Sequence, residues 1–219
     1  MNLVIYTAVT GDYDTILPPK IKEENVRYIA FMDKENFKEI EGWESIPIDI
    51  INDSMVLTAR YYKIFPYKLF DADYSIWVDG RTVINGKLSE LVNLVKDECI
   101  AFYKHRIRKC TYNEGATVIK RKLDNKERVT SQMDRYMEEK YPVNNGLVET
   151  GFMIRNHSHE KLPILMESWW NEVTQYSFRD QLSIKYVMWK HNIKEICLKN
   201  GNVLRNPYTA LYDHKHNRK

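Results

Sequence analysis

The segment Tyr74–Ile84, which reads YSIWVDGRTVI, constrains the fold more than any other part of the chain. It is apolar, β-branched and aromatic up to Val78 and then turns to an acidic residue and a glycine, Asp79 and Gly80. A run of this kind is typical of a buried strand that delivers one carboxylate to the edge of a sheet, where open α/β folds bind their ligands. We therefore expect an α/β fold with Asp79 at its functional site.

Two earlier segments have the same form, an apolar run followed by a polar end. Leu3–Ala8 is followed by the polar loop Thr10–Asp14, and Arg27–Met32 is followed by Asp33. Short continuous apolar runs are typical of strands buried on both faces of a sheet. The pair predicts the first half of a nucleotide-binding α/β domain. The loop itself lacks the glycine spacing of a dinucleotide or Walker motif.

Length and composition narrow the class of protein. The 219 residues suffice for one large α/β domain and not for two, so residues 1–219 should form a single domain with a polar tail over about 207–219. The 33 basic and 30 acidic residues nearly cancel to +3, which argues against nucleic acid as a partner. Three cysteines without metal-type spacing indicate a reducing compartment, and we expect the cytoplasm. No run reaches the ~18 apolar residues of a membrane span, so membrane contact would be peripheral.

Helical patterns alternate with further apolar runs. One helix is expected from Ser54 to Pro66, and its residues Arg60 and Lys63 should share one face. Ser177 and Asp180 fit the capping box of a last long helix, which would give Asp180 a structural role. The other expected helices are Leu88–Val95, Ala116–Lys140 and Ser158–Val173, the last with Ser158 as N-cap and Pro163 in its first turn. The other expected strands are Cys99–Tyr103, Leu147–Ile154 and Ile193–Leu198.

The segment Lys104–Glu114, KHRIRKCTYNE, clusters Lys and Arg side chains around His105. One interpretation is a solvated basic loop that leads into a surface helix. The other is a loop that faces a phosphate or an acceptor, because clustered Arg and Lys side chains favour anions and loops often carry function. The sequence leaves both interpretations open.

The end of the Tyr74–Ile84 segment also suggests a chemistry. A strand followed by an acid, a small residue and a polar position is the layout by which GT-A glycosyltransferases present D-x-D carboxylates to a divalent metal and a diphosphate. Asp79 fills the first acidic position, but Arg81 stands at the second, and a guanidinium can itself pair with a diphosphate. A literal D-x-D, Asp71–Asp73, precedes the strand and should lie at the opposite end of the sheet.

Six segments together resemble a known family. The chain is similar to the glycosyltransferase-like family catalogued as domain of unknown function 616 over roughly residues 3–190, and to the GT-A domain of a chlorovirus capsid-glycosylating enzyme. This resemblance implies a single GT-A-like, Rossmann-related domain with a mixed, mostly parallel central sheet flanked by helices. The segments are YTAVTGDYD from Tyr6, IAFMD ending at Asp33, ARYYKIFPYKLF from Ala59, YSIWVDG from Tyr74, GLVETGFMIRNH from Gly146 and SFRDQLSIKYV from Ser177.

The resemblance also implies a nucleotide-sugar donor, UDP-linked by analogy with the family, and a set of residues around it. Thr7, Ala8 and Asp33 would line the nucleoside pocket, Arg60 would reach the base or diphosphate, and Asp79 would hold Mn²⁺ or Mg²⁺. The turn Glu149-Thr150-Gly151 and the segment Arg179-Asp180-Gln181 would face the transferred sugar and the acceptor. The donor-binding set is completed by Thr10, Lys63, Val78 and Arg81.

Several alternatives stay open within this hypothesis. An inverting transfer needs a carboxylate base, either Asp180 or Glu149, whereas a retaining transfer needs none. The metal could take further ligands from His214 and His216 in the tail, or the chain could rely on Arg and Lys instead. The expected activity is that of a hexosyltransferase of polysaccharide biosynthesis, with a glycan, polysaccharide or other glycoconjugate as acceptor. The alternative is a catalytically silent nucleotide- or carbohydrate-binding module on the same fold.

Overall fold

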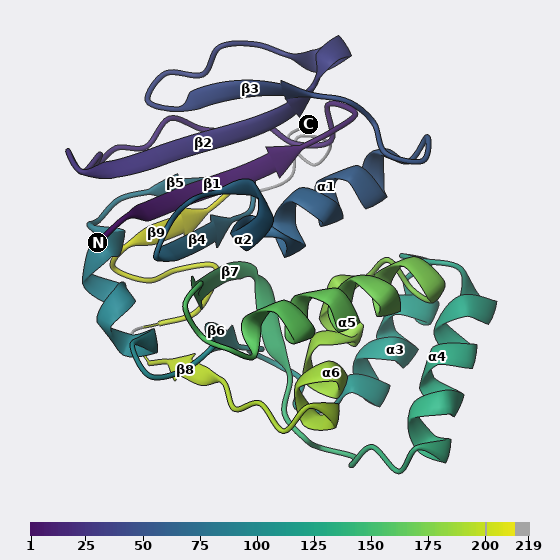
Figure 1. Cartoon of the computed structure of the whole chain (residues 1–219). Helices are drawn as coiled ribbons and strands as arrows, with labels where there is room; N and C mark the ends of the chain where they lie inside the picture. The colour runs from purple at the N-terminus through teal and green to yellow at the C-terminus, as the bar shows by residue number, and fades with distance from the viewer. Residues whose placement is uncertain (200, 213–219) are drawn as a thin grey trace.

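The central sheet has the strand order β3-β2-β1-β4-β7-β6-β8 (Figure 1). The computed structural model describes residues 1–199 and 201–212. The strands of this sheet are β1 Leu3–Val9, β2 Val26–Asp33, β3 Glu44–Ile48, β4 Tyr74–Val78, β6 Ile100–Lys104, β7 Val148–Asn156 and β8 Ile196–Leu198. Strands β1 to β4 are parallel, β7 is antiparallel to both of its neighbours, and β8 is parallel to β6. This mixed, mostly parallel sheet confirms the expected fold class.

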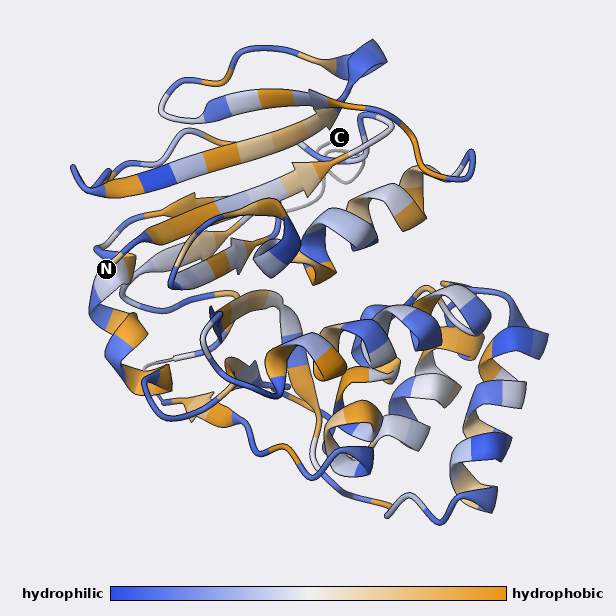
Figure 2. Cartoon of the chain, in the orientation of Figure 1, coloured by the Kyte–Doolittle hydropathy of each residue, from blue (hydrophilic) through white to orange (hydrophobic). Residues whose placement is uncertain are grey.

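Helices and buried side chains cover both faces of the sheet. Ile64 of α1 and Trp169 of α5 join Trp77 of β4 in the buried cluster on one face, and η2 packs with Ile76 on the other. Figure 2 shows the contrast between the largely apolar strand β1 and the mostly hydrophilic helix α4. The α-helices are α1 Met55–Ile64, α2 Pro66–Leu69, α3 Thr111–Lys120, α4 Lys126–Glu138, α5 Leu162–Gln175 and α6 Ile184–Lys190. The 3-10 helices are η1 Lys34–Asn36, η2 Leu88–Val95 and η3 Asp180–Leu182.

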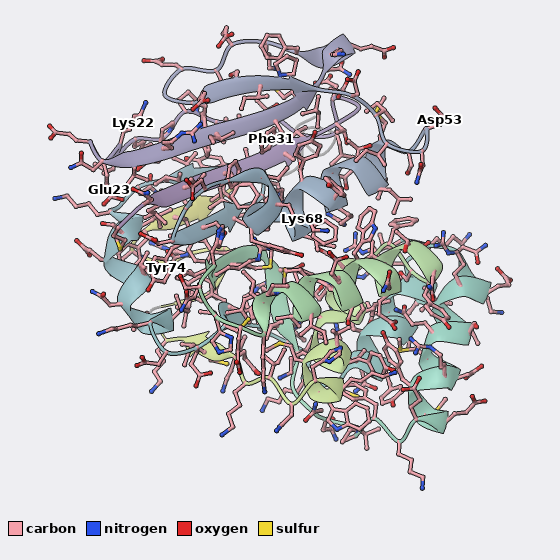
Figure 3. All side chains as sticks on the ribbon, viewed as in Figure 1. Lys22, Glu23, Phe31, Asp53, Lys68 and Tyr74 are labelled. Carbon is pink, nitrogen blue, oxygen red and sulfur yellow. The ribbon has the colours of Figure 1, made fainter. Side chains whose placement is uncertain are left out.

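Strand β4 lies between β1 and β7, and its residues 75–78 are buried. Trp77 meets Tyr6 edge-on, with 5.2 Å between ring centroids, while Val78 faces the other cluster. The strand ends directly before Asp79, so this carboxylate lies at the carboxyl edge of the sheet, as predicted. In Figure 3, Tyr74 at the start of β4 and Asp53 just before α1 lie toward opposite ends of the sheet.

The literal D-x-D segment lies at the opposite edge, as predicted. The Asp73 Oδ2 atom accepts a hydrogen bond from the main-chain nitrogen of Asn2 at 2.7 Å and lies 3.8 Å from the terminal amine of Met1. Asp73 therefore ties the start of β1 to the start of β4. This structural role accounts for the carboxylate without any ligand.

Helix α1 forms as expected, from its N-cap Ser54 to the residues before Pro66. The helix N-caps expected at Ser158 and Ser177 are both wrong. Ser158 is not an N-cap, because α5 begins at Leu162 after Lys161, although Pro163 does occupy its first turn.

Ser177 and Asp180 do not form a capping box. Ser177 Oγ instead donates to Asp124 Oδ2 at 2.5 Å, and the α-helix starts only at Ile184, after η3. The structural role predicted for Asp180 is therefore absent.

Three further segments differ from expectation. Leu88–Val95 forms a 3-10 helix rather than an α-helix, although four of its five apolar residues, all but Leu94, are buried. The single helix expected over Ala116–Lys140 is two helices, α3 and α4, separated at a turn in which Lys122 has a φ of 54°. The irregular tail contains β9 Thr209–Leu211, which pairs antiparallel with β5 Thr82–Ile84. His214 and His216 lie outside the described residues.

No helix among the described residues is long and apolar enough to cross a membrane.

Candidate functional site

The carboxyl end of α1 is locked onto the sheet. The last carbonyl groups of a helix lack intrahelical partners, and here the Lys63 carbonyl accepts hydrogen bonds from Tyr6 Oη and Arg155 Nη2, each at 2.8 Å. Arg155 is fully buried and also donates to the Tyr6 hydroxyl at 2.5 Å. These contacts join α1 to β1 and β7 and fix where the Lys63 side chain begins.

The Lys63 side chain is a buried cation between two carboxylates. It is 2% exposed, and its Nζ lies 2.5 Å from Asp180 Oδ2 and 3.8 Å from Asp79 Oδ1. The same Nζ lies 5.3 Å from the centre of the Trp77 ring. Lys63 therefore connects the end of β4 to η3. We call the charged residues Arg60, Lys63, Asp79 and Asp180 the Asp79 site.

Asp180 is held as an anion. Burial alone would raise the pKa of its carboxyl group, but the positive charges of Arg60, Lys63 and Arg179 outweigh burial and lower that pKa well below its usual range. Arg60 Nη2 lies 3.8 Å from Asp180 Oδ1, and Arg60 Nε donates to the Phe178 carbonyl at 3.2 Å. Arg60 and Lys63 do share one helix face, as predicted, and Asp180 is their common partner.

Asp79 keeps one carboxylate oxygen open. Its Oδ1 accepts a hydrogen bond from Trp77 Nε1 at 2.9 Å, and its main-chain nitrogen donates to the Gly151 carbonyl at 3.0 Å. A Cβ atom at Gly151 would lie 2.9 Å from Asp79 Oδ2, so β7 leaves room for this oxygen only because residue 151 is glycine. The side chain of Asp79 is 35% exposed. We call Oδ2 open because the side chain is partly exposed and no hydrogen bond to this oxygen is found among the described residues.

A second group of polar side chains surrounds Glu149 of β7. Glu149 Oε2 accepts from Gln181 Nε2 at 3.3 Å, and its Oε1 lies 3.8 Å from His105 Nε2. Glu114 of α3 approaches the same His105 nitrogen at 3.9 Å. We call Glu149, His105, Glu114 and Gln181 the Glu149 group.

Both ring nitrogens of His105 have polar neighbours. His105 Nδ1 accepts main-chain hydrogen bonds from Arg108 at 2.9 Å and Ile107 at 3.2 Å, while Nε2 faces Glu149 and lies 3.3 Å from Arg108 Nη2. Burial lowers the pKa of His105, against the opposing effect of Glu149 and Glu114. The sequence shows His105 only as part of a basic cluster, because its contact with Glu149 depends on the pairing of β6 with β7.

Gln181 links the two groups. Its main-chain nitrogen donates to Asp180 Oδ1 at 3.1 Å, and its Nε2 donates to the Val148 carbonyl at 2.7 Å as well as to Glu149. The Arg179-Asp180-Gln181 segment therefore contacts α1 on one side and β7 on the other. Arg179 itself is half-buried, and Thr150 is buried within β7.

Two of the residues expected around the nucleoside, Thr10 and Asp33, hold the loop after β1. Thr10 Oγ1 donates to the Met55 carbonyl at 2.7 Å, which ties the loop to the start of α1. Asp33 accepts from the Gly11 main chain at 2.8 Å and from Asn36 Nδ2 at 2.8 Å. Thr7, Ala8 and Val78 are buried in their strands. Their role in nucleoside binding stays a prediction.

Arg81 anchors the end of the described chain beside Asp79. Its Nη1 donates to the Tyr212 carbonyl at 2.7 Å, and the Tyr212 main-chain nitrogen donates back to the Arg81 carbonyl at 3.1 Å. Val203 also approaches this region, since its Cγ2 lies 3.2 Å from the position of a Cβ at Gly151. The chain that leads to the predicted ligands His214 and His216 therefore passes Arg81, but those histidines lie outside the described residues.

The chain matches a family of known protein domains. Residues 1–202 match the family model described as TOD1/MUCI70, glycosyltransferase-like domain. No curated protein matches the chain. The matched range contains the whole central sheet, the Asp79 site and the Glu149 group. It supports the glycosyltransferase-like resemblance that the sequence motifs indicate.

Proposed function

We propose that this chain, which belongs to the TOD1/MUCI70 glycosyltransferase-like family, transfers a sugar from a nucleotide-sugar donor to an acceptor hydroxyl at the Asp79 site. The observation that carries the proposal is the open Asp79 Oδ2, held at the carboxyl edge of the sheet beside Gly151. Open α/β sheets bind nucleotides at this edge. We further propose a UDP-linked hexose as donor and a glycan or glycoconjugate as acceptor.

A divalent cation fits Asp79, although with few ligands from the protein. The described residues contain no group of three His, Cys, Asp or Glu side chains suited to hold a metal. Mg²⁺ is commonly bound through only one or two carboxylates plus substrate phosphates and waters, so a single open Asp79 oxygen is sufficient. We propose Asp79 as the protein ligand for Mn²⁺ or Mg²⁺, with His214 and His216 as further ligands. When bound, the cation would offset negative charge on the departing diphosphate.

Two arginines support this use of the site. Arg60 is oriented by Asp180 and by the Phe178 carbonyl, and its side chain is 20% exposed. Arg81 follows Asp79 by two positions and has one guanidinium nitrogen bound to Tyr212. We propose that both bind the donor diphosphate, because guanidinium groups match phosphate oxygens in geometry and charge.

Glu149 suits the role of general base better than Asp180 does. Asp180 is buried and engaged with Lys63, whereas the Glu149 side chain is 19% exposed and is held by Gln181 and His105. In the proposed inverting transfer, Glu149 takes the proton of the acceptor hydroxyl as the acceptor oxygen bonds to the anomeric carbon. The bond between that carbon and the diphosphate oxygen breaks, and its electron pair leaves with the nucleoside diphosphate.

The proposal is tested by a thermal-shift panel of UDP-, GDP-, dTDP- and CMP-sugars with and without Mn²⁺. A UDP-sugar with Mn²⁺ should raise the melting temperature by about 5 °C at about 100 times its Kd, because ligand binding stabilises the native state. If no donor changed the melting temperature, the proposed donor site would be contradicted. A shift in melting temperature without any sugar transfer would identify a silent nucleotide-binding module. Arg81 in place of the second acidic residue favours this alternative.

Gly151→Ala should impair turnover without unfolding the protein. The new Cβ would meet Asp79 Oδ2 at 2.9 Å and displace the carboxylate. We expect kcat/KM for donor turnover to fall by roughly 10- to 100-fold, since small misplacements of reacting groups cost that much. Gly115→Ala in α3 is the matched control, because its Cβ would meet Met133 equally closely, at 2.9 Å. Equal activity of the two variants would contradict the role of Asp79 Oδ2.

A further inference from the structure

A cationic surface with an apolar tip lies at the end of β6 and on the loop that follows it to α3, next to the Glu149 group. Lys104, Arg106, Ile107 and Lys109 are all exposed, and Ile107 is 72% exposed. We call these four side chains the basic loop surface. The overall charge of the chain is only +3, so this concentration of positive charge is a local feature.

The loop is held in a fixed shape by its two inward side chains. His105 accepts the main-chain hydrogen bonds of Ile107 and Arg108 through Nδ1, and its own main-chain nitrogen donates to the Leu147 carbonyl at 2.9 Å. Arg108 is paired with Glu114 of α3. With residues 105 and 108 directed inward, the neighbouring residues of the loop face solvent. The surface is therefore built by the fold and does not depend on a ligand for its shape.

The outward cations have no partner in the described part of the chain. The side chains of Lys104, Arg106 and Lys109 form neither a hydrogen bond nor an ion pair there, in contrast to Arg108 of the same loop. Unpaired cations around an exposed isoleucine combine two kinds of attraction. The cations attract anionic head groups, and the isoleucine gains free energy by entering the boundary of the acyl chains.

We propose that the basic loop surface docks the protein on an anionic bilayer. A soluble polyanion would satisfy the three cations but would offer no apolar environment to Ile107. The bilayer accommodates both. Because His105 of the same loop contacts Glu149, docking would bring the proposed acceptor end of the site to the membrane, where an amphiphilic, lipid-linked acceptor would be presented.

Vesicle co-sedimentation of the full chain tests this surface without any sugar donor, so its outcome is independent of transferase activity. The native chain should bind phosphatidylcholine vesicles that contain phosphatidylglycerol and not vesicles of phosphatidylcholine alone, and added salt should weaken the binding. The triple variant Lys104→Gln, Arg106→Gln, Lys109→Gln should bind at least about tenfold more weakly. Ile107→Ser should weaken binding by roughly threefold with all charges retained.

The chain offers a matched control at the other end of α3. Lys120, Arg121 and Lys122 are also exposed and are followed by Leu123, which is 41% exposed. The triple variant Lys120→Gln, Arg121→Gln, Lys122→Gln removes the same charge and should keep native binding. Melting temperatures near the native value would show that each variant is folded.

Three results would overturn the proposal. Equal losses from both triple variants would mean that net charge and not this surface binds lipid. No binding of the native chain to anionic vesicles would exclude a bilayer partner. Retention on a heparin column without vesicle binding would identify a soluble polyanion in its place.

Discussion

Asp79→Asn is expected to lower turnover of the nucleotide-sugar donor by about a thousandfold, the scale of losses seen when a charge-stabilising group is removed from a reaction site. The change keeps the shape of the side chain, and an amide can still accept a hydrogen bond from Trp77 Nε1. It removes the negative charge that Asp79 would offer to a cation and to Lys63. Release of nucleoside diphosphate with and without Mn²⁺ measures the effect.

Asp73→Asn is the control. Asp73 lies six residues before Asp79 in the sequence, at the opposite edge of the sheet. Asp73 contacts the first two residues of the chain and no part of the Asp79 site. Its substitution should leave turnover within about twofold of native, as expected for a surface change away from the site. Native turnover in Asp79→Asn, or an equal loss in Asp73→Asn, would contradict the assignment of the reaction to Asp79.

Lys63→Met is expected to destabilise the protein by about 3 kcal/mol, because it removes the closest partner of a buried carboxylate and leaves Asp180 with only the more distant charges of Arg60 and Arg179. Lys63 and Asp180 are 2% and 6% exposed, and Arg60 at 3.8 Å would be the nearer remaining cation for Asp180. The free energy of unfolding in urea measures the loss. The double variant Lys63→Met, Asp180→Leu should recover part of it, since both charges are then removed.

Lys68→Met provides the matched control for Lys63. Lys68 pairs with Glu167 on the surface, where the two side chains are 41% and 47% exposed. Water screens such pairs, so the loss should stay below about 1 kcal/mol. If Lys63→Met cost no more than Lys68→Met, the buried cation would not be what holds α1 to η3.

The sequence predicts the sheet better than it predicts the contacts of the site. Continuous apolar runs indicate buried strands. For this reason the positions of Asp79 at the end of β4 and of Asp73 at its start could be predicted. The shared helix face of Arg60 and Lys63 also follows from their spacing. These features depend on local periodicity alone.

The role of Asp180 could not be predicted in this way. Ser177 and Asp180 have capping-box spacing, but Asp124 binds Ser177 and Lys63 binds Asp180. Contacts between residues so far apart in sequence are decided by tertiary packing, which overrides a local motif. The contact of His105 with Glu149 has the same origin, because it requires the antiparallel pairing of β6 with β7.

The most direct test of the central claim is a crystal structure with UDP and Mn²⁺ bound. We expect an anomalous manganese peak ~2.2 Å from Asp79 Oδ2, with the diphosphate beside Arg60 and Arg81. An open hollow elsewhere on the surface, against α4, is lined by residues that include Lys126, Arg135 and Tyr176 and shares none with the Asp79 site. A nucleotide bound in that hollow, or bound with no metal at Asp79, would contradict the account.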